Sequence, residues 1–196
     1  MKFSVTPYDL PLVVPFTTAH ATVARRRGLL VALADDNHIG YGEVAPMPGW
    51  TPIGVEQANA MLRRAIATVE EGRDFAEVLD ELETSPEVRA GLSGAAADLA
   101  AHRQGLPLAR SLDADSLETV AVNAVVGFGS VRQTVDAGLD AIQRGFSVIK
   151  MKVGVAAPDI DIERVAMMRT AVGTNVELRL DANGAWDAPT AQRVLE

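Results

Sequence analysis

The chain has 196 residues, of which 48% are hydrophobic and 22% charged, which favours a globular protein of one or two domains with a sizeable core. The net charge of −8 argues against nucleic acid or an anionic membrane as the main partner. The sequence has no cysteine, which excludes disulfides and thiol chemistry, and its proline-interrupted start is typical of neither a signal peptide nor a membrane span. We therefore expect a soluble cytoplasmic protein.

Strands come first along the chain. Apolar runs bounded by turn residues predict three of them, at residues 2–14, 28–34 and 39–44. The last two strands form a hairpin around a polar turn. We expect a mobile loop at residues 17–27 and a stiffer, proline-rich loop at residues 46–52.

Helices follow the strands. Thr51 as N-cap and Pro52 as the first helical residue predict a helix with apolar residues at helical spacing, which Gly72 ends. Two further helices are predicted at residues 74–82 and 86–104.

The pattern changes near residue 118 to alternating strands and helices. Apolar strands are predicted to begin near residues 119, 146 and 176, and each is followed by a helical segment. This spacing of about 30 residues is typical of βα units in a parallel sheet or barrel. We divide the chain into an α+β domain at residues 1–105 and a βα domain at residues 106–196.

Two of the three lysines stand close together. Lys150 and Lys152 lie on one predicted strand, whereas the chain takes the rest of its positive charge, Lys2 apart, from arginine. Residues two apart on a strand share a face, at roughly 6.6 Å along the chain. At an effective dielectric near 20, their charges repel by roughly 2.5 kcal/mol, which favours the neutral, proton-accepting form of one amine. The alternative is a solvated strand edge, which the apolar neighbours disfavour.

The next predicted strand ends in a carboxylate. Glu177, Arg179 and Asp181 share one face, with Asp181 at the C-terminal end, where barrel enzymes place their active sites. A carboxylate there is a suitable Mg²⁺ ligand, because this ion binds one to three protein carboxylates and completes its octahedral shell with water or substrate oxygens. The alternative is a turn residue before Gly184.

The segments IKMKVG (residues 149–154) and LRLDANGAW (residues 178–186) resemble the muconate-lactonizing branch of the enolase superfamily. YGEVAPMPGW (residues 41–50) and GLSGAAADLAAHRQGLPLARSL (residues 91–112) agree with this resemblance. PMPGWT and RLDANGAW most resemble the o-succinylbenzoate synthase family, which acts in menaquinone biosynthesis. The resemblance covers essentially the whole chain. It implies a capping domain at residues 1–105 and the first part of a TIM-type β/α barrel, three βα units long, at residues 106–196.

The resemblance also implies roles for individual residues. Lys152 would be the acid/base group, and Lys150 would tune it and help to hold substrate oxygens. Asp181 would be the first of three acidic Mg²⁺ ligands, and Asn183 a polar residue beside it. The substrate would be a small carboxylate whose neighbouring proton is removed before hydroxide leaves, a lyase reaction that makes the ring of a cyclohexadiene carboxylate aromatic. The substrate would be contacted by Asn183, Arg179, Trp50 and Thr51, the last two from a loop over the barrel mouth.

Family members continue beyond three βα units, and a β/α barrel normally takes about 250 residues. We therefore expect this chain to be a fragment or one piece of a split protein, which either forms a homo-oligomer or needs a C-terminal portion. That portion would supply the remaining strands, two acidic ligands and a further lysine.

Several alternatives stay open. Dipeptide epimerisation and N-acylamino acid racemisation use the same scaffold, and a non-catalytic fragment or subunit is a different class. A phosphate-binding protein is disfavoured, because residues 127–130 lack the full glycine pattern of a dinucleotide site. We interpret His20, His38 and His102 as structural or solvated residues, and residues 25–27 as a solvated arginine run.

Overall fold

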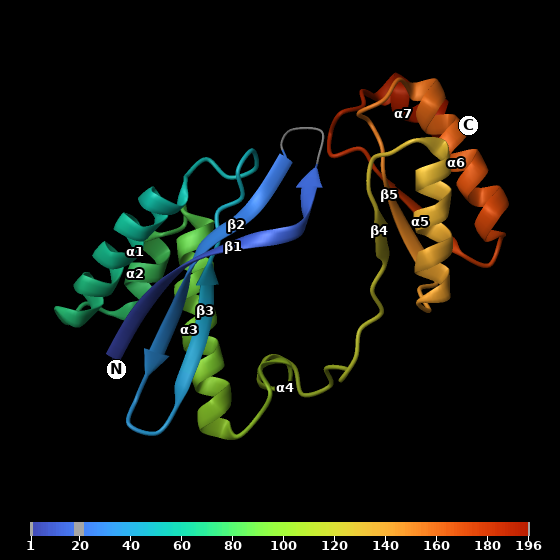
Figure 1. The fold of residues 1–196 in the computed structure, drawn as a ribbon. Helices are drawn as coiled ribbons and strands as arrows, with labels where there is room; N and C mark the ends of the chain where they lie inside the picture. Colours follow the sequence, from blue (N-terminus) through green and yellow to red (C-terminus); the bar gives the residue numbers. More distant parts are fainter. Residues whose placement is uncertain (1, 18–21, 196) are drawn as a thin grey trace. The chain divides into compact units, whose positions relative to one another are not determined.

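The computed structural model describes residues 2–17 and 22–195 (Figure 1). These residues divide into two compact units, one made of residues 2–15 and 23–118, and the other of residues 16, 17, 22 and 119–195. Each unit has its own three-stranded sheet and its own hydrophobic core. No helix in the described part of the chain is long and apolar enough to cross a membrane.

The first unit packs helices against a sheet in which β2 lies between β1 and β3, with β2 and β3 antiparallel. Its strands are β1 (Lys2–Thr17, which ends in the second unit), β2 (Thr22–Ala34) and β3 (Ile39–Val44). Its helices are α1 (Val55–Glu70), α2 (Phe75–Glu81), α3 (Pro86–Gln104) and α4 (Leu108–Leu112). The core is apolar throughout and includes Leu29, Val31, Leu62, Leu92 and Leu99.

Two expectations about this unit are wrong. Residues 22–27 belong to β2 rather than to a loop, and Arg26 is held there by hydrogen bonds to the carbonyl oxygens of Ala45 and Pro46. Thr17 of that predicted loop belongs to β1, and residues 18–21, with His20, lie outside the described residues. Helix α1 begins at Val55 with Gly54 as its N-cap, because the hydroxyl of Thr51 donates to carbonyl oxygens of its own loop.

The second unit alternates strands and helices as predicted. Its elements are β4 (Ala124–Val126), α5 (Val131–Gln143), β5 (Val148–Lys152), α6 (Pro158–Val172), β6 (Glu177–Asp181) and α7 (Ala188–Leu195). The sheet is parallel, with β5 between β4 and β6. The first strand is shorter than predicted, since residues 119–123 are outside it. Three parallel βα units are therefore present, of the kind that a β/α barrel repeats.

Helix α3 lies unusually close to β3 (Figure 1). A Cβ atom added at Gly42 would stand 2.0 Å from the carbonyl oxygen of Gly91 and 2.7 Å from the backbone nitrogen of Ala95. Only glycine allows two backbones to approach in this way. The small residues of α3, such as Gly91 and Ala95, therefore allow the helix to pack closely against β3.

We predict that Gly42→Ala destabilises the protein by about 1–3 kcal/mol, because the added methyl group overlaps backbone atoms that cannot turn aside. Urea unfolding followed by circular dichroism should show a lower midpoint. Gly94→Ala is the control: its Cβ would meet nothing closer than 3.7 Å, and alanine favours a helix. Equal midpoints for the two variants would contradict the close approach.

Candidate functional site

The candidate site lies where two parallel strands end. The pairing of β5 with β6 places Lys150 beside Arg179 and Lys152 beside Asp181. Ile149 and Met151 alternate with the lysines and are fully buried in the apolar core of this unit. This alternation turns both lysines toward the opposite face of the sheet, because successive side chains of a strand point to opposite faces.

Both lysines contact one carboxylate oxygen. The Nζ atom of Lys152 lies 2.7 Å from Oδ2 of Asp181, and Nζ of Lys150 lies 2.8 Å from the same oxygen. Lys152 also donates to Oδ1 of Asn183 at 2.7 Å. The structure therefore brings together four residues that the sequence singled out, and the side chains of Lys152 and Asp181 face one another.

The two lysines differ in their exposure to solvent. The side chain of Lys152 is 6% exposed, whereas that of Lys150 is 36% exposed. The ring of Phe16, which belongs to the same unit, lies over the Lys152 ammonium with its centroid 5.6 Å from Nζ. Lys152 is thus shielded on one side by an aromatic ring that no pattern in the sequence pointed to.

Asp181 is held strongly in its ionised form. Burial by itself raises the pKa of this carboxyl group, but hydrogen bonds from Lys150, Lys152 and the backbone N–H of Asn183, together with the Lys152 charge, outweigh it. The net result is a pKa well below the usual range for aspartate. A carboxylate that stays charged is the form in which Asp181 can bind a cation.

Asp181 is a candidate ligand for Mg²⁺. Asp181 provides a hard, ionised oxygen donor of the type that this ion prefers. Within residues 2–17 and 22–195, no group of three or more histidine, aspartate or glutamate side chains gathers in a way that would hold a metal. Asp181 therefore fits the role of one ligand among several.

Arg179 forms an ion pair with Glu177 on its own strand. Its Nε atom donates to Oε1 of Glu177 at 2.7 Å, and the side chain is 56% exposed. The contact between Arg179 and substrate stays a prediction.

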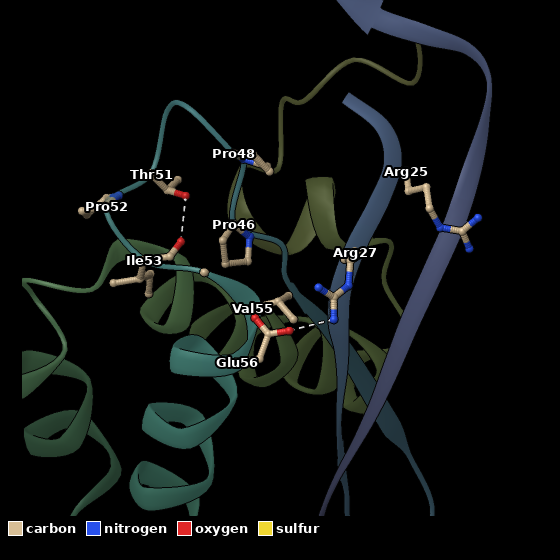
Figure 2. Close-up of a pocket in the computed structure, with 10 residues that line it drawn as sticks. Arg25, Arg27, Pro46, Pro48, Thr51, Pro52, Ile53, Val55 and Glu56 are labelled. Atoms are coloured by element: carbon tan, nitrogen blue, oxygen red, sulfur yellow. Dashed lines mark hydrogen bonds and ion pairs between the residues drawn. The ribbon is translucent and has the colours of Figure 1, made fainter. Parts of the chain in front are cut away.

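Trp50 and Thr51 belong to the other unit. Thr51 lines a pocket of about 320 Å³ between the proline-rich loop, the start of α1 and β2. Figure 2 shows Arg27 of this pocket facing Glu56, at 2.7 Å between their charged groups. Trp50 is about half exposed. Their predicted contact with substrate is likewise untested.

The second unit contains a buried ion pair that the sequence patterns did not predict. Asp161 and Arg164 of α6 are 0% and 1% exposed, and their side chains are 2.7 Å apart. Their spacing along the helix is shared by many surface pairs. Only the buried Met168, one turn further on the same face, marks these positions as inward.

Both parts of the chain match models of known protein families. Residues 2–99 match the family model "MenC, N-terminal domain", and residues 133–196 match "Enolase C-terminal domain-like". The o-succinylbenzoate synthase of Thermosynechococcus vestitus is 30% identical over 98% of this chain and 55% of its own length. The L-Lys-D/L-Arg epimerase of Desulforapulum autotrophicum is also 30% identical, over 91% of this chain and 52% of its own length.

A solved structure also matches almost the whole of this chain. The dipeptide epimerase from Enterococcus faecalis, complexed with Mg and the dipeptide L-Leu-L-Tyr, matches with a TM-score of 0.89 and 25% identity. The match covers 98% of this chain and 56% of that one. The chain spans about half the length of the curated relatives that it matches. With a MenC-type N-terminal part and an enolase-type C-terminal part, the chain belongs to the enolase superfamily.

Proposed function

We propose that this chain forms part of an enzyme that removes a proton next to a carboxylate group, with Lys152 as the acid/base group. The observation that carries the proposal is the contact of Lys152 with Asp181 at the ends of neighbouring parallel strands, at 2.7 Å. A shielded amine beside an ionised carboxylate suits proton transfer to and from carbon, because both groups are held in place before the substrate arrives.

The remaining residues of the site take supporting roles in this proposal. Asp181 is one ligand of Mg²⁺, and a Mg²⁺ ion bound there supplies positive charge that stabilises the negative charge developing on the substrate carboxylate. Lys150, the more exposed lysine, helps to hold substrate oxygens, and Asn183 fixes the Lys152 amine. Arg179, Trp50 and Thr51 contact the small carboxylate substrate.

The reaction that we favour is dehydration of a cyclohexadiene carboxylate to o-succinylbenzoate, a lyase step of menaquinone biosynthesis in the cytoplasm. The MenC-type match over residues 2–99 and the similarity to the o-succinylbenzoate synthase of Thermosynechococcus vestitus support it. In this proposal the second unit, with its three parallel βα units, is part of a β/α barrel.

Dipeptide epimerisation is the second candidate. It is supported by the equal identity to an epimerase and by the match to a dipeptide epimerase structure at a TM-score of 0.89. The two reactions are separated by assaying the protein that contains this chain with both substrates. Epimerisation without dehydration would contradict our first choice.

We predict that Lys152→Ala lowers kcat by about 10²-fold or more, because general acid/base groups contribute that much to proton transfer. The measurement is steady-state turnover of the better substrate, with circular dichroism to show that the variant is folded. Lys2→Ala is the matched control, since Lys2 is an exposed lysine at the start of β1 in the other unit. Full activity of Lys152→Ala would refute the proposed role.

We also predict that Asp181→Asn weakens Mg²⁺ binding about tenfold or more, because a contact to a charged group contributes roughly 1.5–3 kcal/mol. Isothermal titration calorimetry of the protein that contains this chain measures the change. Asp187→Asn is the control, because Asp187 accepts a hydrogen bond from Thr190 at the start of α7 instead. Equal Mg²⁺ affinity in both variants would remove Asp181 from the ligand set.

The same titration tests the non-catalytic alternative. We expect these 196 residues by themselves to bind Mg²⁺ more weakly than micromolar, because the described part of the chain gathers no set of three acidic ligands. Micromolar binding by this chain alone would show that it holds a complete site.

A further inference from the structure

The buried ion pair of α6 lies directly behind the candidate site. Arg164 donates four hydrogen bonds through its guanidinium group, and their acceptors come from four different segments of the second unit. One acceptor is the backbone carbonyl oxygen of Lys152, at 3.1 Å from Nη1. The side chain of Arg164 is 1% exposed, so its guanidinium group is shielded from bulk water.

Arg164 donates hydrogen bonds to backbone carbonyl groups just beyond the point where the pairing of β4 with β5 stops. The pairing of β4 with β5 ends at Val126 and Met151. One residue further along each strand, the carbonyl oxygens of Gly127 and Lys152 both accept from Arg164, at 3.0 and 3.1 Å. The planar guanidinium, with donors fixed in a fork, is suited to bridging two carbonyl groups in this way.

Asp161 fixes the chain on the other side of Lys152. One of its carboxylate oxygens pairs with Arg164, and the other accepts from the backbone N–H of Gly154 at 2.8 Å. Gly154 has a φ of +92°, a conformation that favours glycine, so the chain turns sharply there. The pair therefore holds the backbone both at Lys152 and two residues beyond it.

A contribution to stability does not by itself explain why Asp161 and Arg164 are buried as an ion pair. Burying two ions is costly, and well-packed apolar side chains of similar volume often serve stability as well or better. Apolar residues would leave the carbonyl oxygens of Gly127 and Lys152 and the N–H of Gly154 without these partners. The particular contribution of the pair is the geometry of the backbone that carries Lys152.

We propose that Arg164 and Asp161 are positioning residues, which hold the backbone of Lys152 so that its amine meets Asp181 and the substrate. This inference rests on the proposed function in taking Lys152 as the acid/base group. In structural terms, a change at Arg164 should alter the position of the Lys152 side chain, because Arg164 holds the Lys152 carbonyl oxygen.

The lysine content of the chain allows a direct test. These 196 residues contain three lysines, so labelling the protein with ¹³C at lysine Cε gives few signals from this part of the chain in a ¹³C–¹H correlation spectrum. Lys152→Arg removes one signal and so assigns it. An amine held between Asp181 and Asn183 should give Lys152 two distinct Hε resonances, and Lys2 serves as the internal reference.

Arg164→Lys is the decisive variant. It keeps a positive charge beside Asp161, but a single ammonium cannot replace the fork that joins Gly127 to Lys152. We expect the Hε resonances of Lys152 to move by more than their line width, or to merge, while those of Lys2 stay in place. Unchanged Lys152 resonances in the folded variant would overturn the proposal.

A second variant covers the case in which Arg164→Lys does not fold. Thr134→Val removes one acceptor of Arg164 and leaves the sequence of the strands that carry Lys152 and Asp181 unchanged. It should move the Lys152 resonances in the same direction by a smaller amount, and an unchanged spectrum would again overturn the proposal. Arg103→Lys is the matched control, because it alters an arginine–aspartate pair, Arg103 with Asp35, in the other unit.

Different results would contradict the proposed function and this inference. If Lys152→Ala keeps full activity while Arg164→Lys shifts the Lys152 signal, Lys152 is not the acid/base group but the positioning contact stands. If Lys152→Ala is inactive and Arg164→Lys leaves the signal unchanged, the function stands and the positioning role is wrong.

Discussion

The candidate site depends on one constraint, the register in which β6 pairs with β5. Because the side chains of a strand alternate between its two faces, a slip of one residue would turn Asp181 away from Lys152. The register is kept by the apolar residues on the buried face, Ile149 and Met151, whose partners are Leu178 and Leu180. The packing of the core thus determines which charged groups meet at the ends of the strands.

Charge is distributed unevenly across the second unit. On one side of the sheet, two lysines share one carboxylate at the strand ends. On the other side of the Lys152 backbone, a buried arginine and aspartate satisfy carbonyl and N–H groups that the sheet leaves unpaired. Each buried charge therefore has an opposite charge and further hydrogen bonds, which is the condition for keeping ions in a protein interior. The first unit achieves close packing differently, through glycine at the contact of β3 with α3.

The family of this chain and the reaction proposed for it rest on different observations. Membership of the enolase superfamily follows from matches along the chain. The reaction depends on which groups surround the substrate, and a synthase and an epimerase are equally identical to this chain. A scaffold that hosts several reactions places the shared proton-transfer groups on strand ends and the discriminating contacts on loops. For this reason the lysine–aspartate contact supports the class of chemistry more strongly than it supports one substrate.

The sequence by itself determined the alternation of strands and helices after residue 118, the common face of Lys150 and Lys152, and the place of Asp181 at a strand end. These follow from local periodicity, which depends on residues close together in the chain. It did not determine the start of α1, because the Thr51 hydroxyl bonds within its own loop. Apart from Met168 on the same helix face, it did not indicate that Asp161 and Arg164 are buried, since the acceptors of Arg164 at Gly127 and Lys152 are distant in sequence. Contacts between distant segments were decided only by the tertiary structure, because local patterns carry no information about which groups the packed sheet leaves unpaired.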